Sequence, residues 1–354
     1  MQSSMPIFAR VQAGYRKDSE ETMKKILVLS GYGVTLRARK GLFQIVEKGK
    51  KTAEISPVDI EAIVVATKAA SITSSAVILA SKLGIDMVFL DNWLPVSRLI
   101  PATYGSTLKT WVKQMLAVRR RRLEYARAFA EGKVFNQRMI LYNLYKRYRG
   151  SRAETRIIRA RIKDSIDSAT LALRQIREAE RVEQVRSAEA HAAKEYWKAV
   201  SKAIPKELGF RQRIKKYTLP KEEEPDPFNK ALNIGYAALL RETWRAVFIA
   251  GLNPYYGFLH ARRPGRMSLV LDLMEEFRPI AVDRPLINLA RKETEIFKKL
   301  KEDDKEAVAR VWKVVVEMLS KEPKPLKDII LQQARKLTSS IIEKRPYTPY
   351  KSSW

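Results

Sequence analysis

A histidine and two nearby carboxylates are the residues of this sequence with the clearest potential for chemistry. His260 ends a segment rich in aromatic residues and glycine, residues 251–260, and a turn follows it. The next stretch, residues 267–278, is apolar apart from a few polar positions and should form a helix halted before a proline. Within it Asp272 and Glu275 are three residues apart and therefore share one helix face.

Asp272 stands among seven apolar side chains, so the helix that carries it should be largely buried. A buried carboxylate is costly unless a cation accompanies it. The spacing is compatible with a hard metal ion bound by His260 and the carboxylates, Glu276 lying close by. It is equally compatible with a buried salt bridge to Arg278 or Arg284, and a lone histidine is more often a packed core residue than a ligand.

A third carboxylate comes from a distant part of the sequence. Glu189 lies in a predicted helix, residues 187–197, whose small side chains would let another helix approach closely. Glu189 then has room to face the cluster around His260. The alternative is an exposed Glu189 that pairs with Arg186. His191, the second of only two histidines, is expected on the surface or in packing.

The positive charge of the chain is large and unevenly distributed. The 354 residues carry 68 Lys and Arg against 39 Asp and Glu, a formal charge of +29, and residues 109–216 alone contribute +18. Residues 113–149 hold eleven basic side chains and two acidic ones, including four consecutive arginines, Arg119, Arg120, Arg121 and Arg122. We interpret this segment as a surface for phosphate groups, the alternative being a solvated, highly charged helix of a heat-adapted protein.

The pattern of residues changes near Leu108, from β-favouring to helix-favouring. Residues 25–100 contain short β-favouring runs separated by glycine-containing breaks, with one helix from Ser74 to Gly84. Later segments suit long helices, namely residues 108–149, 152–181, 185–203, 228–250, 285–300, 302–320 and 325–343. The sequence therefore predicts an α+β protein in which a small N-terminal β-rich domain precedes a larger all-helical C-terminal domain. The expected boundaries are a loose N-terminal extension 1–22, a β-rich domain 23–100, a linker 101–107, a helical domain 108–344 and a flexible tail 345–354.

Composition excludes several classes of protein. Cysteine is absent, which rules out disulfide frameworks, thiolate catalysis, cysteine-ligated zinc and iron–sulfur clusters. No run of about 18 apolar residues occurs, so we expect no membrane-spanning helix, and the first residues lack the apolar core of a signal peptide. These features are typical of an intracellular protein, and we expect a cytoplasmic location.

Three stretches resemble a known family, the CRISPR-associated endonuclease/integrase family, which forms the larger subunit of the spacer-acquisition machinery. The first stretch is Glu189 with the Tyr–Trp pair that follows seven residues later, and the second is residues 226–236. The third runs through residues 251–260 into the Arg-Pro-Gly-Arg turn and residues 271–279. The likeness spans roughly residues 25–340, and an Ile-Ser-Pro sequence at residues 55–57 adds to it.

The resemblance implies a role for each of these residues. Glu189, His260 and Glu275 would bind Mg²⁺ or Mn²⁺, and Asp272 would support the site as a further acid. The family often has glycine after the first of these, where this sequence has Ala190. In addition we expect phosphate contacts from Arg262, Arg263 and Arg266, and site-lining positions for Asn233 and Tyr236, a core position being the alternative for Tyr236.

The resemblance also implies an activity and partners. The expected reaction is metal-dependent cleavage or joining of double-stranded DNA, with water or a DNA 3′-hydroxyl as nucleophile, which inserts foreign fragments into a CRISPR array in antiviral defence. A homodimer made partly through the β-rich domain is expected, together with a small partner nuclease. The competing hypothesis is a non-catalytic architectural nucleic-acid-binding protein, which metal-dependent activity would distinguish.

Overall fold

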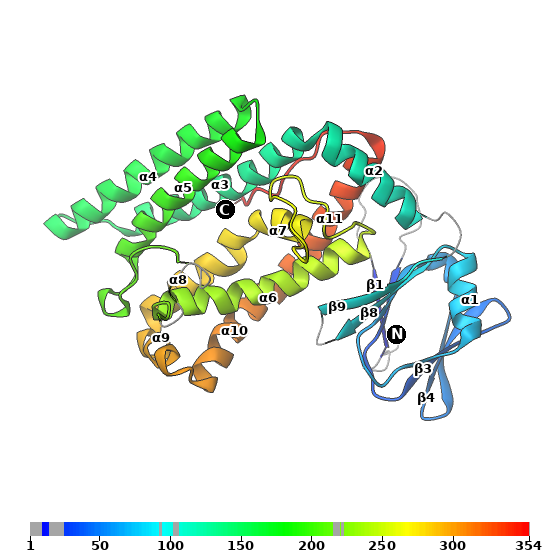
Figure 1. Cartoon of the computed structure of the whole chain (residues 1–354). Coiled ribbons are helices and arrows are strands. Elements are labelled where there is room, and N and C mark those ends of the chain that lie inside the picture. Colours follow the sequence, from blue (N-terminus) through cyan, green and yellow to red (C-terminus); the bar gives the residue numbers. More distant parts are fainter. Residues whose placement is uncertain are drawn as a thin grey trace. The chain divides into compact units, whose positions relative to one another are not determined.

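The computed structural model describes residues 9–13, 25–91, 94–101, 106–214, 220 and 223–353 (Figure 1). The chain forms two compact units. A β-rich unit comprises residues 1–114 with 244–253, and a helical unit comprises residues 115–243 with 254–354. The predicted α+β organisation is confirmed, with strands in the first part of the chain and helices in the second.

The β-rich unit contains two sheets. The first has the order β1-β2-β6-β8-β9, with parallel pairing between β2, β6 and β8 and antiparallel pairing at both edges. The second has the order β5-β4-β3-β7, in which β3 and β7 are parallel. The strands are β1 Ala9–Ala13, β2 Lys25–Leu29, β3 Val34–Arg39, β4 Leu42–Glu47, β5 Lys50–Ile55, β6 Ile60–Val65, β7 Ser71–Ile72, β8 Asp86–Asp91 and β9 Leu94–Leu99.

A single apolar core joins the two sheets to α1 (Ser74–Lys82). Leu27, Leu36, Phe43 and Ile63 are completely buried in it. The hydroxyl of Thr73 caps α1 by accepting the amide of Ala76, and small buried residues on α1 allow the helix to lie close to the strands. The predicted helix from Ser74 is thus confirmed.

The predicted boundaries of this part of the chain need two corrections. Ala9–Ala13 fall in the segment that we expected to be an extension, yet they form β1, which pairs antiparallel with β2 along its full length. The exposed edge of β2 offers backbone hydrogen bonds that a five-residue segment can satisfy without a distinctive side-chain pattern. In the predicted linker, residues 102–105 lie outside the described residues and α2 already begins at Ser106.

The helical unit is built around α3, α4 and α5, which pack against one another (Figure 1). The helices that follow α1 are α2 Ser106–Arg120, α3 Arg122–Arg147, α4 Ala153–Glu178, α5 Val182–Ala203, α6 Pro227–Ile249, α7 Ser268–Glu275, α8 Arg284–Lys292, α9 Thr294–Lys299, α10 Lys305–Ser320 and α11 Leu326–Glu343. The start of α2 and the end of α6 belong to the β-rich unit. A π-helical turn, Pro279–Asp283, leads directly into α8, because proline is tolerated in the first turn of a helix.

Two predicted helices are each divided in the structure. The segment 108–149 breaks at Arg121, whose φ and ψ of −127° and 20° are not helical. The segment 285–300 divides at Glu293, with a φ of −130°. Neither break contains glycine or proline, so the sequence carries no local signal for it.

The expectation of a flexible tail at residues 345–354 is wrong for the residues that the structure describes. Tyr347 is buried with its ring 5.3 Å from that of Phe129, and Tyr350 stacks on Phe277 at 5.0 Å. The tail lies so close to α3 that a Cβ at Gly132 would stand 2.9 Å from the Cβ of Pro349. We call residues 346–353 the C-terminal strap, since aromatic and proline residues bind it to the helices.

Candidate metal centre

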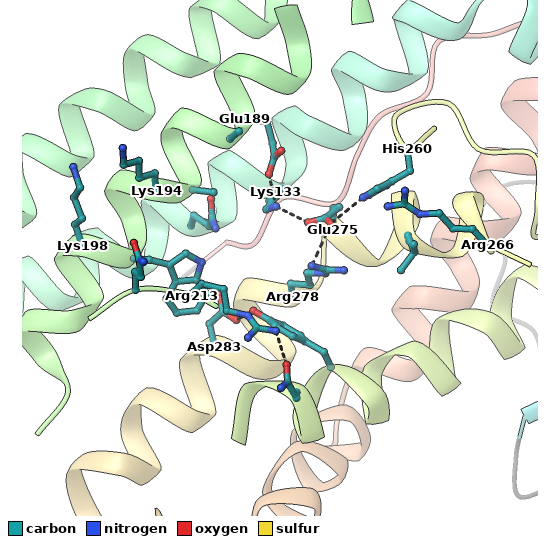
Figure 2. Close-up of a pocket in the computed structure, with 18 of the residues that line it drawn as sticks. Lys133, Glu189, Lys194, Lys198, Arg213, His260, Arg266, Glu275, Arg278 and Asp283 are labelled. Carbon is teal, nitrogen blue, oxygen red and sulfur yellow. Dashed lines mark hydrogen bonds and ion pairs between the residues drawn. The ribbon is translucent and has the colours of Figure 1, made fainter. Parts of the chain in front are cut away.

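A cavity of about 880 Å³ lies within the helical unit and collects most of the predicted site residues (Figure 2). Side chains from α3, α5, α6 and α7 line it, and they carry more positive than negative groups. Its lining includes Lys133, Glu189, Lys194, Arg213, Asn233, Tyr236, His260, Arg263, Arg266, Glu275, Arg278 and Asp283. A concave, basic surface with a few carboxylates is suited to an anionic ligand accompanied by a cation.

Asp272 organises the loop that presents His260. Its fully buried carboxylate accepts the backbone N–H groups of Phe258, Leu259 and His260 at 2.5, 2.9 and 2.9 Å. The same carboxylate lies 2.7 Å from Nδ1 of the His260 ring. A Cβ at Gly257 would come within 2.6 Å of this carboxylate, so the loop requires glycine there. The sequence predicts a cation beside Asp272. In the structure the partners of this carboxylate are instead backbone N–H groups and the imidazole of His260.

The opposite ring nitrogen of His260 points toward Glu275 at the end of α7 (Figure 2). Nε2 of His260 lies 3.7 Å from Oε1 of Glu275, and a guanidinium nitrogen of Arg278 lies 3.4 Å from the same oxygen. The salt bridge considered for Asp272 is therefore made by Glu275. Burial alone would raise the pKa of Glu275, but the charges of Arg278, Lys133 and His260 outweigh it and hold this pKa at about 2.

Lys133 joins Glu275 to Glu189. Its Nζ lies 2.7 Å from Oε2 of Glu275 and also forms an ion pair with Oε1 of Glu189, so the ammonium stands between carboxylates from α7 and α5 (Figure 2). Burial would lower the pKa of Lys133, but the two carboxylates raise it above its ordinary value and keep the amine charged. Arg186, the alternative partner considered for Glu189, instead donates to the carbonyl of Leu259 at 2.7 Å.

Lys133 is the site residue that sequence reasoning missed. It was counted with the basic surface of residues 113–149, yet its side chain is only 12% exposed. A signal was available, because Lys133 stands between Gly132 and Val134, which are both buried in α3. A lysine within such a small and apolar stretch is expected to have a buried carboxylate partner.

The donor types fit a hard divalent ion, although within the described part of the chain no three His, Asp or Glu side chains gather closely enough to hold one. The reason is visible in the geometry, since the ammonium of Lys133 occupies the space between Glu189 and Glu275. Oε2 of Glu275 is buried, and the ammonium of Lys133 lies beside it at 2.7 Å. Two carboxylates and an imidazole nitrogen are ligands that Mn²⁺ and Mg²⁺ accept.

A second buried acid lies farther along the pocket. Asp283 accepts hydrogen bonds from the hydroxyls of Tyr236 at 2.6 Å and Tyr196 at 3.0 Å. Burial raises the pKa of Asp283 to about 6, and the tyrosine hydroxyls limit the rise. Asn233 accepts a hydrogen bond from Arg213 at 2.7 Å. Both Asn233 and Tyr236 line the cavity, and the guanidinium groups of Arg213 and Arg278 lie over the ring of Tyr236.

The four consecutive arginines have two different environments. Arg119 and Arg120 are exposed at the end of α2. Arg121 binds Glu124 at 2.6 Å and the carbonyl of Arg345 at 2.9 Å, and Arg122 donates to the carbonyl of Phe258 at 2.9 Å. The prediction that all four serve as phosphate contacts therefore needs correction, because the second pair makes internal contacts.

The predicted arginines of the turn after His260 remain at the surface. Arg263 and Arg266 line the cavity, whereas Arg262 lies over the ring of Tyr256 at 4.7 Å.

His191 is exposed on α5, as expected. Among the described residues no helix is both long and apolar enough to cross a lipid bilayer.

The class of this protein is defined by three features: a β-rich unit, a helical unit and a histidine–carboxylate centre in a basic pocket. The family described as CRISPR associated protein Cas1 matches residues 27–310. The CRISPR-associated endonuclease Cas1 1 of Saccharolobus solfataricus is 39% identical over 327 residues, which are 92% of this chain and 84% of that protein. The chain therefore belongs to the Cas1 family, and the resemblance seen in the sequence is confirmed.

Solved structures share the fold. A casposase bound to its integration product has a TM-score of 0.73 at 24% identity, covering 93% of this chain and 98% of the casposase chain. A chain of a partial Cas6-RT-Cas1–Cas2 complex has a TM-score of 0.68 at 19% identity, covering 93% and 99%. The arrangement of strands followed by helices is thus that of known Cas1-like structures.

Proposed function

We propose that this protein is a metal-dependent DNA endonuclease and integrase that inserts DNA fragments into a CRISPR array. The observation that carries the proposal is that Glu275 lies between His260 on one side and the Lys133–Glu189 ion pair on the other, inside one basic pocket of a Cas1-family chain. Its Saccharolobus relative is called an endonuclease, and the casposase with the same fold is described as bound to an integration product.

Glu189, His260 and Glu275 would hold the Mg²⁺ or Mn²⁺ ion, with Asp272 as a supporting acid. Such an ion supplies charge neutralisation at the phosphoryl group and lowers the pKa of a bound nucleophile. Asp272 fixes the protein side of this arrangement, because it contacts Nδ1 of His260 and so leaves Nε2 free to act as a ligand. Rigid placement of the imidazole by a buried carboxylate is typical of metal-binding histidines.

The surrounding cations would hold the DNA. Arg263 and Arg266 line the pocket beside His260, where a scissile phosphate would need two or more positive groups. Arg119 and Arg120 lie exposed and free to contact the DNA backbone farther away. In integration a DNA 3′-hydroxyl attacks phosphorus while the bond to the leaving oxygen breaks, so one phosphodiester replaces another and no external energy source is needed.

The working assembly that we propose is a homodimer that acts on double-stranded DNA with a small partner nuclease. Support for the partner comes from the Cas1–Cas2 complexes among the structures of the same fold. A net charge of +29 supports a DNA substrate, because affinity for phosphate grows with the number of neutralised charges. The dimer contact is expected in the β-rich unit.

The test is cleavage and strand transfer on linear and branched DNA duplexes with Mn²⁺, Mg²⁺ or EDTA. Wild type is expected to give products with either metal and none with EDTA. His260→Ala should lower the rate by at least about a hundredfold with DNA affinity little changed. His191→Ala is the matched control, since it removes an exposed imidazole from α5.

A non-catalytic architectural protein remains the alternative that this experiment would reveal. Tight, salt-sensitive DNA binding by wild type without products under any metal would contradict the proposal. Loss of DNA binding in His260→Ala would contradict the division of labour between the metal centre and the basic surface.

A further inference from the structure

The position of Lys133 raises a question about how a metal ion enters this centre. The ammonium lies between Glu189 and Glu275, its side chain is 12% exposed, and the exposed fractions of the two glutamates are 17% and 4%. Each partner comes from a different helix, with Lys133 on α3, Glu189 on α5 and Glu275 on α7. The lysine therefore holds three helices together at the point where the ligands converge.

The same position is the one that a metal ion needs. Glu189 and Glu275 would hold the metal ion together with His260, so the ion would need access to the carboxylates that now contact Lys133. The ammonium already lies 2.7 Å from Oε2 of Glu275 and contacts Glu189. A divalent ion at the same two carboxylates would repel the ammonium strongly, because these side chains are largely removed from solvent. Metal binding must then move the ammonium away.

We propose that Lys133 is a tethered cation that balances the two glutamates in the metal-free protein and is displaced by the metal ion. The inference rests on the proposed metal-dependent function and adds to it a residue that regulates metal affinity. Competition from the lysine weakens metal binding but keeps the buried carboxylates neutralised when no metal is present.

The pocket offers the displaced side chain a place to go. Lys133 itself lines the cavity of about 880 Å³, and its four-methylene stem can carry the ammonium into that space while its Cα stays in α3. Arg278 remains 3.4 Å from Oε1 of Glu275 and keeps one cation beside this carboxylate. Lys194 lines the same cavity from α5, away from Glu275 (Figure 2), and provides a control of equal charge.

The first experiment measures Mn²⁺ affinity by isothermal titration calorimetry without DNA. Lys133→Met is expected to bind Mn²⁺ at least about tenfold more tightly than wild type, because the internal competitor is gone. Lys194→Met should bind within about threefold of wild type, since this lysine lies away from the converging carboxylates. Equal or weaker binding by Lys133→Met would overturn the inference.

The titration also separates this inference from the proposed function. If wild type and Lys133→Met bind Mn²⁺ with the same affinity, the metal centre stands and the role of Lys133 falls. If neither binds Mn²⁺, the metal-dependent function fails as well. His260→Ala, which lacks one ligand, should lose Mn²⁺ binding both in the wild-type background and combined with Lys133→Met.

A measurement on the wild-type chain avoids dependence on a variant that fails to fold. Lysine acetylation followed by mass spectrometry should show slow labelling of Lys133 without metal and at least about fivefold faster labelling with saturating Mn²⁺, because the amine leaves its carboxylate partners. Labelling of Lys194 should be the same in both conditions. Unchanged or slower labelling of Lys133 with Mn²⁺ would contradict displacement.

Discussion

Glu275 and Glu276 are neighbours at the end of α7, both buried, and they belong to two different regions of the molecule. Glu275 faces the pocket and is surrounded by Lys133, Arg278 and His260. Glu276 faces the C-terminal strap, and the groups that donate hydrogen bonds to it are neutral. The pKa of Glu275 is held at about 2, whereas burial raises the pKa of Glu276 to about 8.

The contacts of Glu276 explain its different behaviour. It accepts hydrogen bonds from the hydroxyl of Tyr347 at 2.7 Å and from the amide of Tyr350 at 2.6 Å. The side chain of Gln333 lies 3.5 Å away and also donates to the carbonyl of Thr348 at 2.7 Å. These donors limit the rise in pKa but do not supply the charge that would keep a fully buried carboxylate ionised.

Burial is therefore not what separates a chemical site from a structural one in this helix. The pocket surrounds its carboxylate with cations and so keeps it charged, as the proposed metal ligand has to be. The strap surrounds its carboxyl with neutral donors and uses it to fasten the end of the chain. Four predictions, from the largest expected effect to the smallest, test this contrast.

The largest effect is expected in the pocket of Glu275, when Asp272, the residue that positions His260, is replaced. Asp272→Asn keeps the shape of the side chain, but one carbonyl oxygen cannot accept from the backbone of Phe258, Leu259 and His260 together with the ring. Cleavage should fall about a hundredfold, and the free energy of unfolding should fall by about 2 kcal/mol. Single-turnover cleavage and urea denaturation would measure the two; normal cleavage would show that His260 needs no such support.

Around Glu276, whose hydrogen-bond donors are neutral, deleting residues 346–354 should lower the stability of the fold strongly. The deletion removes Tyr347 and Tyr350 as donors to Glu276 and leaves buried groups of Asn136 without the backbone of Tyr350 and Ser352. We expect the free energy of unfolding to fall by at least about 3 kcal/mol by urea denaturation. Tyr347→Phe should cost about 1 kcal/mol, and Ser353→Ala, at an exposed position, close to nothing. Full stability of the truncated chain would show that the strap is not part of the fold.

The two glutamates should also give opposite pH dependences of stability. The folded chain keeps a proton on Glu276 between its unfolded pKa of 4.5 and its folded pKa of about 8, so the free energy of unfolding should fall as pH rises through this window. The expected slope is up to about 1.4 kcal/mol per pH unit. Glu275, with a pKa of about 2, contributes stability above pH 4.5 that is lost on acidification below it.

Denaturation at pH 5, 6.5 and 8 with EDTA, in wild type and Glu276→Gln, measures the first slope. The variant keeps the size of the side chain but cannot ionise, so the difference between the two proteins should shrink or reverse as pH rises. Parallel curves would mean that Glu276 does not change its protonation across this window.

The smallest effect is expected for the four consecutive arginines, where an exposed pair contrasts with a pair that makes internal contacts. Arg119 and Arg120 are exposed, so replacing both with Ala should weaken duplex binding by less than about tenfold at moderate salt and reduce its salt dependence, with stability unchanged. Replacing Arg121 and Arg122 should instead lower stability, because these side chains bind Glu124 and the carbonyl of Phe258. Fluorescence anisotropy across a salt series measures the first effect; identical behaviour of the two pairs would remove the distinction.

Much of the fold could be predicted because its signals are local. Alternating apolar runs, the helix that begins at Ser74 and the change of texture near Leu108 each depend on a few adjacent residues. The strap, β1 and the break at Arg121 could not be predicted, since their stability comes from contacts with distant parts of the chain. Tyr347 and Tyr350 become structural residues only when Glu276 and Phe277 lie beside them.

The site shows the same division. His260, Asp272 and Glu275 were accessible from spacing in one short stretch, and Glu189 was accessible only with the family resemblance. The buried position of Lys133 could not be predicted as readily, because a single basic residue within a basic segment carries only a weak sequence signal of burial. Its role follows from carboxylates that are 56 and 142 residues away along the chain.

The central claim is that cations keep Glu275 ionised as the proposed metal ligand, whereas neutral donors leave Glu276 a structural acid. It is tested most directly by Mn²⁺ binding to Glu275→Gln and Glu276→Gln. Both substitutions preserve side-chain size, both stand at the end of α7, and calorimetry measures both in one buffer. Glu275→Gln should weaken Mn²⁺ binding by at least about a hundredfold, and Glu276→Gln should change it by less than about threefold. Equal losses in the two variants, or a larger loss in Glu276→Gln, would contradict the account.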